Sequence, residues 1–418
     1  MHQIMGGSSG TGARRLFAAA LVAGLVAACA ATPASSPSTP VAPTALPTAS
    51  SSPLPTAAPM SSATTDSWVQ ACRAKGSSSE PVSLSAIAPA GPGMVVAGDF
   101  GSSNIRAAAW TSRDGSVWTE AQLPGSDGVF PNAIAANSGG SVIGATAGDS
   151  EGAVAWHSGD GLTWERVTLD AGTGIRAAAA GASSHVLGGL AVGGRPVLWS
   201  SPDGIHWTRR SLGVEDRKFG FIRGIVAGGP GFVAWGLFTD TPLPDVFGAS
   251  YQLPADAGVP WTSVEGTTWT RAADASPFAG AWITSIVLVG SRLLAFGQVG
   301  TDPIAATWSS DDGLAWTRLP EGPPAIGGSD YFVALGDGRV LELAQPASGS
   351  PIAAWLSADG VTWRPVGELA SAAWAIQGVI RHGASIIAVG TPDSPAAQTG
   401  CVPLPIWTRS IGSFGAGG

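Results

Sequence analysis

Arg176, Arg223 and Tyr331 are the residues of this chain whose types and positions could do chemistry on a ligand. The three occupy equivalent places in a pattern that recurs along the sequence, so a repeat fold would bring them around one axis. Guanidinium groups bind carboxylates and other anions, and a tyrosine hydroxyl adds a hydrogen-bonding group to such a pocket. These residue types predict a site for an anionic or sugar-like ligand.

The same place is polar in every copy of the pattern. Counting two residues back from an apolar strand residue gives Ser85, Asn132, Arg176, Arg223, Thr284, Tyr331 and Gln377. The residues just before them are mostly apolar, and this alternation is typical of a strand with one packed and one solvated side. We expect the polar set to ring the mouth of a central channel, with Trp282 and Trp374 nearby. The alternative is that a water-filled channel simply needs a polar lining.

A second repeat supplies the elements that would position this ring. Six copies of a unit carry two tryptophans eight residues apart, with a serine, an acid and a glycine between them. The acids of successive copies lie 43 to 62 residues apart, a period that indicates a propeller or a solenoid. The tryptophan pairs are Trp110 and Trp118, Trp156 and Trp164, Trp199 and Trp207, Trp261 and Trp269, Trp308 and Trp316, and Trp355 and Trp363.

Each tryptophan unit is predicted to be a β-hairpin. The two tryptophans would face each other across a turn of about three residues, with glycine where a positive φ is needed. The acid and the serine would accept hydrogen bonds from the backbone N–H groups of the turn. Because the acid recurs in six turns, we assign it a structural role. The six acids are Asp114, Asp160, Asp203, Glu265, Asp312 and Asp359.

The serine, acid, glycine and second tryptophan of each unit resemble the Asp-box, or BNR, repeat of sialidases and related β-propellers. Each unit is one residue shorter than the family pattern between the acid and the tryptophan, and one copy has Glu265 in place of aspartate. The resemblance covers nearly all of the chain after residue 66. It implies a propeller whose boxes lie away from the active face, and it says little about function.

A further hairpin, with a Gly-rich turn and an apolar strand ending in small residues, lies between the tryptophan units. It occurs seven times, near residues 84–98, 131–145, 175–190, 222–236, 283–297, 330–344 and 376–390. Two hairpins per unit make a four-stranded blade. We therefore predict an all-β fold, a seven-bladed β-propeller of four-stranded blades with Asp-box hairpins. The segment at Trp68 would complete the last blade opposite Trp407 and close the ring.

The start of the chain predicts export. Arg14 and Arg15 precede a short apolar run that ends at Ala28, so residues 1–28 are predicted to be a signal peptide. The sequence up to Cys29 resembles a bacterial lipobox, which implies cleavage before Cys29 and lipidation of that residue. The alternative is an ordinary signal peptide with a chance cysteine.

The remaining chain divides in two. Residues 29–65 are mostly Ala, Pro, Ser and Thr, a composition that predicts a disordered tether, and residues 66–418 would form the propeller. The expected location is extracytoplasmic, with a lipid anchor to the bacterial cell membrane as the only membrane contact. If Trp68 faces Trp407, then Cys72 and Cys401 lie close together, and an oxidising compartment favours a disulfide between them. The alternative is two free buried cysteines.

Composition and spacing exclude several classes of function. A net charge of −8 with only 12% charged residues carries no nucleic-acid signature. No His or Cys cluster has metal-ligand spacing and no Gly motif would hold a phosphate, so no metal or cofactor is expected. We expect a monomer. The segment from Gly236 to Pro260 accounts for the longest repeat spacing, and such a loop is either functional or disordered.

Two functions remain. Sialidases use three arginines to hold a carboxylate, a Tyr–Glu pair as nucleophile and an Asp as acid/base. The resemblance would assign Tyr331, Arg176 and Arg223 to such a site, but the third arginine and the glutamate have no candidate. We therefore favour a binding or scaffold module for an extracellular protein, glycan or wall polymer, similar to the seven-bladed photosystem assembly factors. The alternative is a sialidase-like glycoside hydrolase, which a Tyr331–carboxylate pair at the channel mouth would favour.

Overall fold

The computed structural model describes residues 68–73, 82–90, 93–101, 105–148, 151–214, 219–241, 257–300, 304–324, 329–345, 351–369, 374–392 and 403–414. The predicted signal peptide, the tether, Cys29 and Cys401 lie outside these residues. Lipidation of Cys29 and the Cys72–Cys401 disulfide therefore stay predictions. In the described part of the chain no helix is long and apolar enough to cross a membrane.

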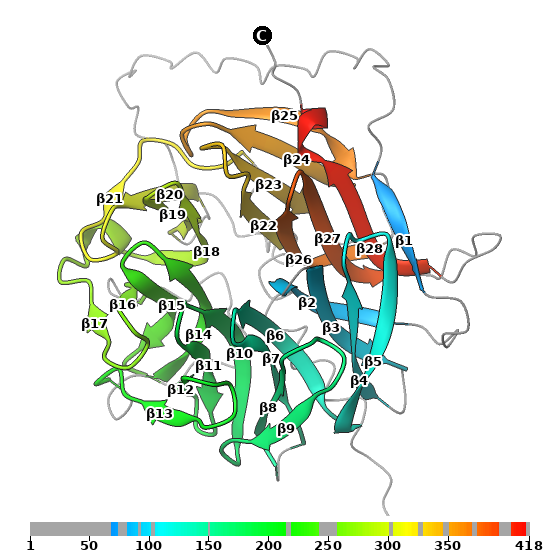
Figure 1. Ribbon diagram of the computed structural model, residues 1–418. Coiled ribbons are helices and arrows are strands. Elements are labelled where there is room, and N and C mark those ends of the chain that lie inside the picture. The colour runs from blue at the N-terminus through cyan, green and yellow to red at the C-terminus, as the bar shows by residue number, and fades with distance from the viewer. Residues whose placement is uncertain are drawn as a thin grey trace, which may run out of the picture.

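The strands form a ring of seven four-stranded antiparallel blades, which confirms the predicted β-propeller (Figure 1). Blade one comprises β2 (Val82–Ala90), β3 (Gly93–Phe100), β4 (Arg106–Ser112) and β5 (Val117–Asp127). Blade two comprises β6 (Phe130–Asn137), β7 (Gly140–Thr146), β8 (Ala153–Ser158) and β9 (Glu165–Thr168). Blade three comprises β10 (Thr173–Ala180), β11 (His185–Ala191), β12 (Arg195–Ser201) and β13 (Thr208–Arg210). Blade four comprises β14 (Phe219–Gly228), β15 (Gly231–Thr239), β16 (Trp261–Ser263) and β17 (Thr270–Arg271).

The other three blades follow the same order from the centre outward. Blade five comprises β18 (Ala281–Val289), β19 (Arg292–Val299), β20 (Ile304–Ser310) and β21 (Thr317–Arg318), preceded by the 3-10 helix η1 (Ser276–Phe278). Blade six comprises β22 (Ser329–Ala334), β23 (Val340–Gln345), β24 (Ile352–Ser357) and β25 (Trp363–Leu369). Blade seven comprises β26 (Trp374–His382), β27 (Ser385–Pro392), β28 (Pro403–Ser410) and β1 (Val69–Arg73), and the 3-10 helix η2 (Ile411–Phe414) follows β28.

The outer strand of blade seven comes from the start of the described chain. β1 runs antiparallel to β28 with Val69 opposite Thr408 and Gln70 opposite Trp407. The expectation that Trp68 faces Trp407 is therefore wrong by two residues, and Trp68 instead makes an edge contact with Phe414. The cause is the 3-10 helix after β28, whose Phe414 supplies the aromatic surface that Trp68 covers. Cys72 lies opposite Pro403, and the role of β1 in holding the ring closed stays a prediction.

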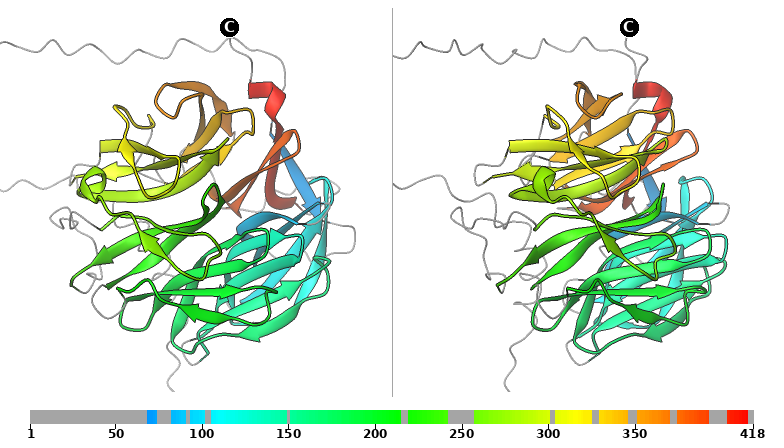
Figure 2. Two further views of the ribbon diagram at one scale, coloured as in Figure 1. Left: turned by 60° about the vertical axis from the view of Figure 1, so that its left-hand side comes forward. Right: turned by 90° about the vertical axis from the view of Figure 1, so that its left-hand side faces the viewer.

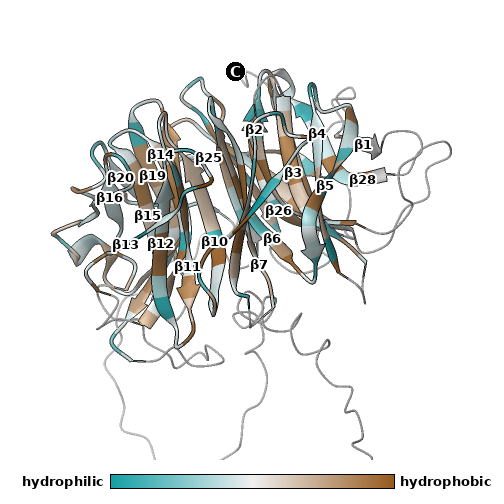
Figure 3. Ribbon diagram, turned by 60° about the horizontal axis from the view of Figure 1, so that its bottom comes forward, coloured by the Kyte–Doolittle hydropathy of each residue, from teal (hydrophilic) through white to brown (hydrophobic). Residues whose placement is uncertain are grey.

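Side chains from adjacent blades pack face to face and form the core as a series of seams. Figure 2 shows the blades from two further sides. Strand residues alternate between the two sides of a blade, so each blade contributes one apolar face to each neighbouring seam. Figure 3 shows hydrophobic residues along the strands and hydrophilic ones toward the hairpin ends. The first tryptophan of the repeat is fully buried in blades one to five, at Trp110, Trp156, Trp199, Trp261 and Trp308.

The antiparallel order gives the ring two distinct faces. The Asp-box turns and the turns between the first and second strands lie on one face, here called the box face. The connections after the second and fourth strands lie on the other, the loop face. The segment predicted to be a loop from Gly236 is partly strand, because β15 continues to Thr239. Residues 242–256 lie outside the described part of the chain.

Candidate functional site

A β-bulge in the innermost strand holds six of the seven polar ring residues. In each of these strands the pairing with the second strand skips one residue: Ser85, Asn132, Arg176, Arg223, Thr284 and Gln377. A bulged residue has no partner in the ladder, and it increases the local twist and turns its side chain away from the regular alternation. The innermost strands, and with them the six bulges, line the centre of the ring (Figure 1).

A glycine on the second strand makes room for the bulge in four blades. Gly297 lies opposite Ile283, and a Cβ added to it would be 2.1 Å from the carbonyl oxygen of Trp282. Gly98, Gly189 and Gly236 have the same close approach to the innermost strand. The small residues noted at the ends of these strands are therefore required by the bulge, a role that the sequence pattern alone did not reveal.

Two of the bulged residues mainly stabilise the bulge itself. The hydroxyls of Ser85 and Thr284 donate hydrogen bonds to the carbonyls of Ala97 and Phe296 on the second strand, at 3.2 and 3.0 Å. These contacts occupy the backbone acceptor that the skipped pairing leaves open. Gln377 is exposed. Ser85 and Thr284 thus fit the structural role that a polar channel lining requires.

The two arginines form a ladder with aromatic rings across blades three to five. The Arg176 guanidinium lies over the ring of Phe221 at 5.0 Å, and the Arg223 guanidinium lies over the ring of Trp282 at 5.6 Å. Phe221 and Trp282 touch edge to face, with 6.3 Å between their centroids. Each arginine therefore stacks on the aromatic residue of the next blade, which fixes the plane of its guanidinium.

Neither arginine forms an ion pair among the described residues, although the charge of Asp330 raises the pKa of Arg223 against the larger effect of burial. Arg223 donates a hydrogen bond to the Thr284 carbonyl at 3.4 Å, and Nε of Arg176 is buried without an acceptor. Burial lowers the pKa of both guanidinium groups, and for Arg176 the neighbouring Arg223 charge lowers the pKa further. Two adjacent, half-buried cations without an ion pair attract an anion strongly, because little water screens them.

Tyr331 lies in the one blade whose innermost strand pairs without a bulge. It stands directly opposite Leu343 in regular pairing and packs against the apolar seam between blades six and seven. Burial raises the pKa of Tyr331 to about 12, with smaller opposing effects from the charges of Arg223 and Asp330. The described residues show no hydrogen bond from the Tyr331 hydroxyl to a carboxylate. Trp374 lies on β26, but its side chain is outside what the structure describes.

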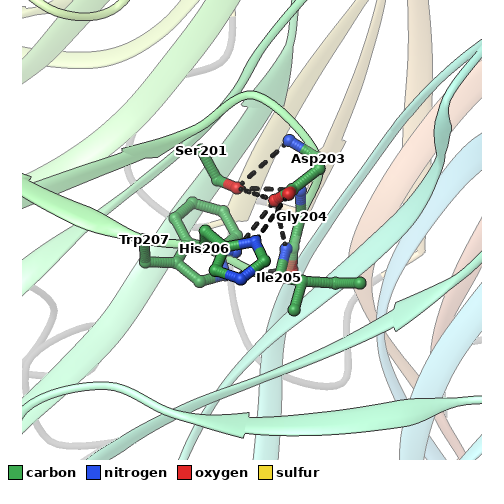
Figure 4. Close-up of polar contacts among 6 residues, drawn as sticks. All are labelled: Ser201, Asp203, Gly204, Ile205, His206 and Trp207. Atoms are coloured by element: carbon green, nitrogen blue, oxygen red, sulfur yellow. Dashed lines mark hydrogen bonds and ion pairs between the residues drawn. The ribbon is translucent and has the colours of Figure 1, made fainter.

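The Asp box of blade three shows how the repeated turn is held (Figure 4). Ser201 Oγ accepts the N–H of Gly204 at 2.8 Å and donates to Asp203 Oδ1 at 3.0 Å. The same Oδ1 accepts the N–H groups of Ile205 and His206 at 2.9 and 2.8 Å. These bonds to the ionised form hold the pKa of Asp203 well below its usual range. They bear out the predicted acceptor roles of the serine and the acid.

The pairing of the two tryptophans differs from the prediction. Trp199 lies opposite Arg209, and the last pair before the turn is Ser200 with Thr208. The turn is therefore longer than three residues, because the acid gathers N–H groups from two positions beyond the glycine. Trp207 folds back at the end of the turn and donates from Nε1 to the Gly204 carbonyl at 3.0 Å. Gly204 has a φ of 77°, as the turn requires.

The fourth box is incomplete. In blade four Ser263 Oγ still accepts the N–H of Gly266 at 2.9 Å. The Glu265 carboxylate makes no turn hydrogen bond within the described residues, and Nε1 of Trp269 is buried without an acceptor. The extra methylene of glutamate carries the carboxylate past the N–H groups that an aspartate reaches. The sequence shows the substitution of glutamate for aspartate, and the structure shows that this turn lacks the carboxylate hydrogen bonds of the other turns.

Sequence reasoning missed one buried acid. Glu342 on β23 is fully buried, and neither carboxylate oxygen has a hydrogen-bond partner. Burial raises the pKa of Glu342, and the charge of Asp330 on β22 raises it further. Both acids stand in the blade without a bulge. A signal was present, because Glu342 occupies a strand position that is apolar in the other repeats.

Two surface hollows of the described residues adjoin the repeated turns. One of about 360 Å³ adjoins the box of blade two and is lined by His157, Asp160 and Glu165. Another of about 620 Å³ adjoins the box of blade five and is lined by Arg292, Asp311 and Asp312. Because box carboxylates already accept turn hydrogen bonds, these shallow hollows are a by-product of the repeated turn.

Comparisons with known proteins identify the fold. No family model matches the chain, and no curated protein matches it. Among solved structures, YCF48 bound to a D1 peptide is similar with a TM-score of 0.51 and 14% identity, over 82% of this chain and 96% of that chain. The propeller domain of the trilobed protease from Pyrococcus furiosus has a TM-score of 0.48 and 10% identity, over 79% of this chain and 96% of that chain. The Trypanosoma rangeli sialidase has a TM-score of 0.47 and 13% identity, over 80% of this chain and 54% of that chain. At these identities the likeness shows that this chain has a β-propeller fold.

Proposed function

We propose that the chain is a binding module whose channel mouth holds an anionic group of an extracellular protein, glycan or wall polymer. The observation that carries this proposal is the ladder of Arg176, Phe221, Trp282 and Arg223. It presents two guanidinium groups, each over an aromatic ring, that form no ion pair among the described residues. Such groups bind carboxylate or phosphate through paired hydrogen bonds.

The aromatic rings strengthen this proposal. Phe221 is buried, whereas Trp282 is partly exposed beside Arg223. A partly exposed indole next to a cation suits a ligand with an anionic end and an apolar or sugar face. A similar propeller was solved with a bound peptide, and a binding role of that general kind agrees with the ladder.

The proposed setting comes from the start of the sequence. Cleavage before Cys29 and lipidation there would anchor the propeller outside the bacterial cell membrane, on the tether of residues 29–65. This anchor would keep the module near the membrane, within reach of surface polymers and proteins. Mass spectrometry of the chain expressed in a lipoprotein-processing bacterium tests it, since a lipidated Cys29 must be the first residue of the mature protein.

A sialidase-like glycoside hydrolase is the second candidate. It is favoured by the presence of Tyr331 within the charge field of Arg223. Two observations count against this activity. No acid among the described residues is hydrogen-bonded to Tyr331, and the raised pKa of Tyr331 makes its hydroxyl a poor nucleophile near neutral pH. We therefore place this activity second.

One experiment separates the two. The full-length chain is tested for hydrolysis of fluorogenic glycosides, sialosides included, and for binding to an array of anionic and matched neutral oligosaccharides and peptides. Binding of anionic probes that weakens at least tenfold in Arg176→Ala and Arg223→Ala, and not in the outer-strand control Arg318→Ala, supports the binding module. Turnover that is lost in Tyr331→Phe would replace it with the enzyme. Equal binding by all variants would remove the channel mouth as the site.

A further inference from the structure

Glu342 occupies a core position that is apolar in all six other blades. It lies on the second strand opposite the first tryptophan of its blade, Trp355. The residues at the same place in the other blades are Val96, Ile143, Leu187, Ala234, Ala295 and Ala388. A carboxyl group is thus present where the repeat needs only an apolar side chain.

The side of blade six that bears Glu342 faces blade five. Val340, two residues before it, packs with Leu294 and Phe296 of blade five. The cross-strand neighbour of Glu342 is Phe332, whose ring stacks on Phe296 with 4.1 Å between centroids. Since strand residues two apart share a face, Glu342 points into the seam between blades five and six.

A second carboxyl group shares this seam. Asp330 precedes Phe332 by two residues and is therefore on the same face of β22. It pairs with Ala344 and stands diagonally to Glu342 across the two strands. Diagonal neighbours on one face of a sheet are within reach of long side chains. The structure thus places two acids on the same face of blade six, where the charge of Arg223 also acts on Asp330.

Burial of the Glu342 carboxyl group is energetically unfavourable unless another group stabilises it. Its side chain is fully buried, and both carboxylate oxygens lack a hydrogen-bond partner among the described residues. Burying a carboxyl group without partners is costly in either protonation state, and such groups in proteins are paired, hydrogen-bonded or bound to metal ions. No arginine or lysine of the described chain forms an ion pair with Glu342.

We propose that the seam between blades five and six holds one hard cation of the Ca²⁺ class, bound by the carboxylates of Glu342 and Asp330. Oxygen ligands of this kind suit hard cations. The described residues contain no cluster of three or more His, Cys, Asp or Glu side chains. The remaining ligands would therefore be carbonyl oxygens or water.

The test uses the full-length chain after treatment with a chelator. Thermal unfolding is followed at pH 7 with Ca²⁺, Mg²⁺ or Na⁺ added in separate arms. At a hundredfold excess over Kd, the preferred ion should raise the wild-type midpoint by roughly 5 °C. Glu342→Gln should abolish this shift, whereas Glu368→Gln, an exposed acid of the same blade, should keep it.

The alternatives give different results. If no ion raises the wild-type midpoint, Glu342 is a buried neutral acid and the proposal is overturned. An equal shift in wild type and Glu342→Gln would mean that an ion binds elsewhere, which also overturns it. Should Glu342→Gln fail to fold, Asp330→Asn serves as the second variant, and its ion-dependent shift must be at least halved. Binding of anionic probes at the channel arginines is a separate measurement, so either proposal can fail alone.

Discussion

Blades five and six share the same outer architecture and differ in the parts that face the seams and the channel. In both turns the aspartate, Asp312 or Asp359, accepts the N–H groups two and three residues ahead, but Nε1 of Trp363 in blade six is buried without an acceptor. Blade five has a bulge at Thr284 and a buried Trp308, whereas blade six has regular pairing at Tyr331 and a partly exposed Trp355. The turn and the seam of a blade are therefore determined independently.

The difference shows where this repeat can change without losing the fold. The box turn is closed by local hydrogen bonds, so it tolerates a different neighbour in the seam. The inner strands depend on close packing across blades. In blade six the buried carboxyl group of Glu342 occurs together with regular pairing in place of a bulge and with a partly exposed Trp355. The residues that distinguish blade six from blade five in this respect, Tyr331 and Glu342, thus lie on the inner two strands.

The largest expected effect concerns the bulge. Gly297→Ala in blade five should destabilise the protein by about 3 kcal/mol or more, because the new Cβ meets a backbone oxygen that cannot move freely. The matched change in blade six, Ala344→Gly, should cost about 1 kcal/mol at most, since regular pairing there needs no glycine. Urea unfolding of both variants measures this difference. Equal losses would mean that the two blades do not differ at this position.

The next effect concerns Glu342 in the absence of divalent ions. Burial raises its pKa from the ordinary 4.5 to about 9, so the folded state holds a proton that the unfolded state releases. Stability from this group is complete below pH 4.5 and is lost as pH rises toward 9, by about 3 kcal/mol at pH 7. Glu342→Leu should therefore be more stable than wild type at pH 8 and should lack this slope.

A reciprocal variant sharpens the same point. Ala295→Glu places the acid at the equivalent position of blade five and should introduce a second slope of the same sign. Unfolding free energies measured by urea from pH 5 to pH 9, with chelator present, give both slopes. A wild-type profile parallel to that of Glu342→Leu would contradict the assigned burial.

A smaller effect is expected at the boxes. Asp312→Ala and Asp359→Ala should each cost about 1–2 kcal/mol at pH 7 through lost turn hydrogen bonds, whereas Glu265→Ala should cost less than about 0.5 kcal/mol. The pKa of Asp312 is held below its ordinary 3.8 by the N–H groups of Ala315 and Leu314. Its contribution is therefore present above that pH and is lost as pH falls through the lowered pKa. Thermal midpoints at pH 7 and pH 3 test both statements.

The smallest effect lies in the box of blade three. Asp203 raises the pKa of the exposed His206 through a hydrogen bond and an ion pair between Nδ1 and Oδ2, at 2.7 Å. The stabilisation is present below pH 6.5 and is lost as pH rises through the raised pKa. NMR titration should show a lower pKa for His206 in Asp203→Asn. An unchanged value would show that the solvated pair does not form in solution.

Much of this protein follows from local sequence. The tryptophan and glycine spacing, the recurring serine and acid, and the polar residue in each inner strand specify hairpins by short-range rules, and their number predicts seven blades. Asp203 and Ser201 were assigned to their turn correctly because every partner lies within a few residues. The signal peptide and tether likewise rest on local composition and stay predictions.

Tertiary structure decided the contacts that depend on a neighbouring strand or blade. The offset of Trp199 from Trp207, the bulges under the polar ring and the regular pairing of Tyr331 are matters of register between strands. The stacking of Arg176 on Phe221 and the burial of Glu342 depend on which residue the next blade presents. The sequence period predicts that an inner strand recurs in every blade. The packing of unlike blades determines which of its side chains contacts water, an aromatic ring or another acid.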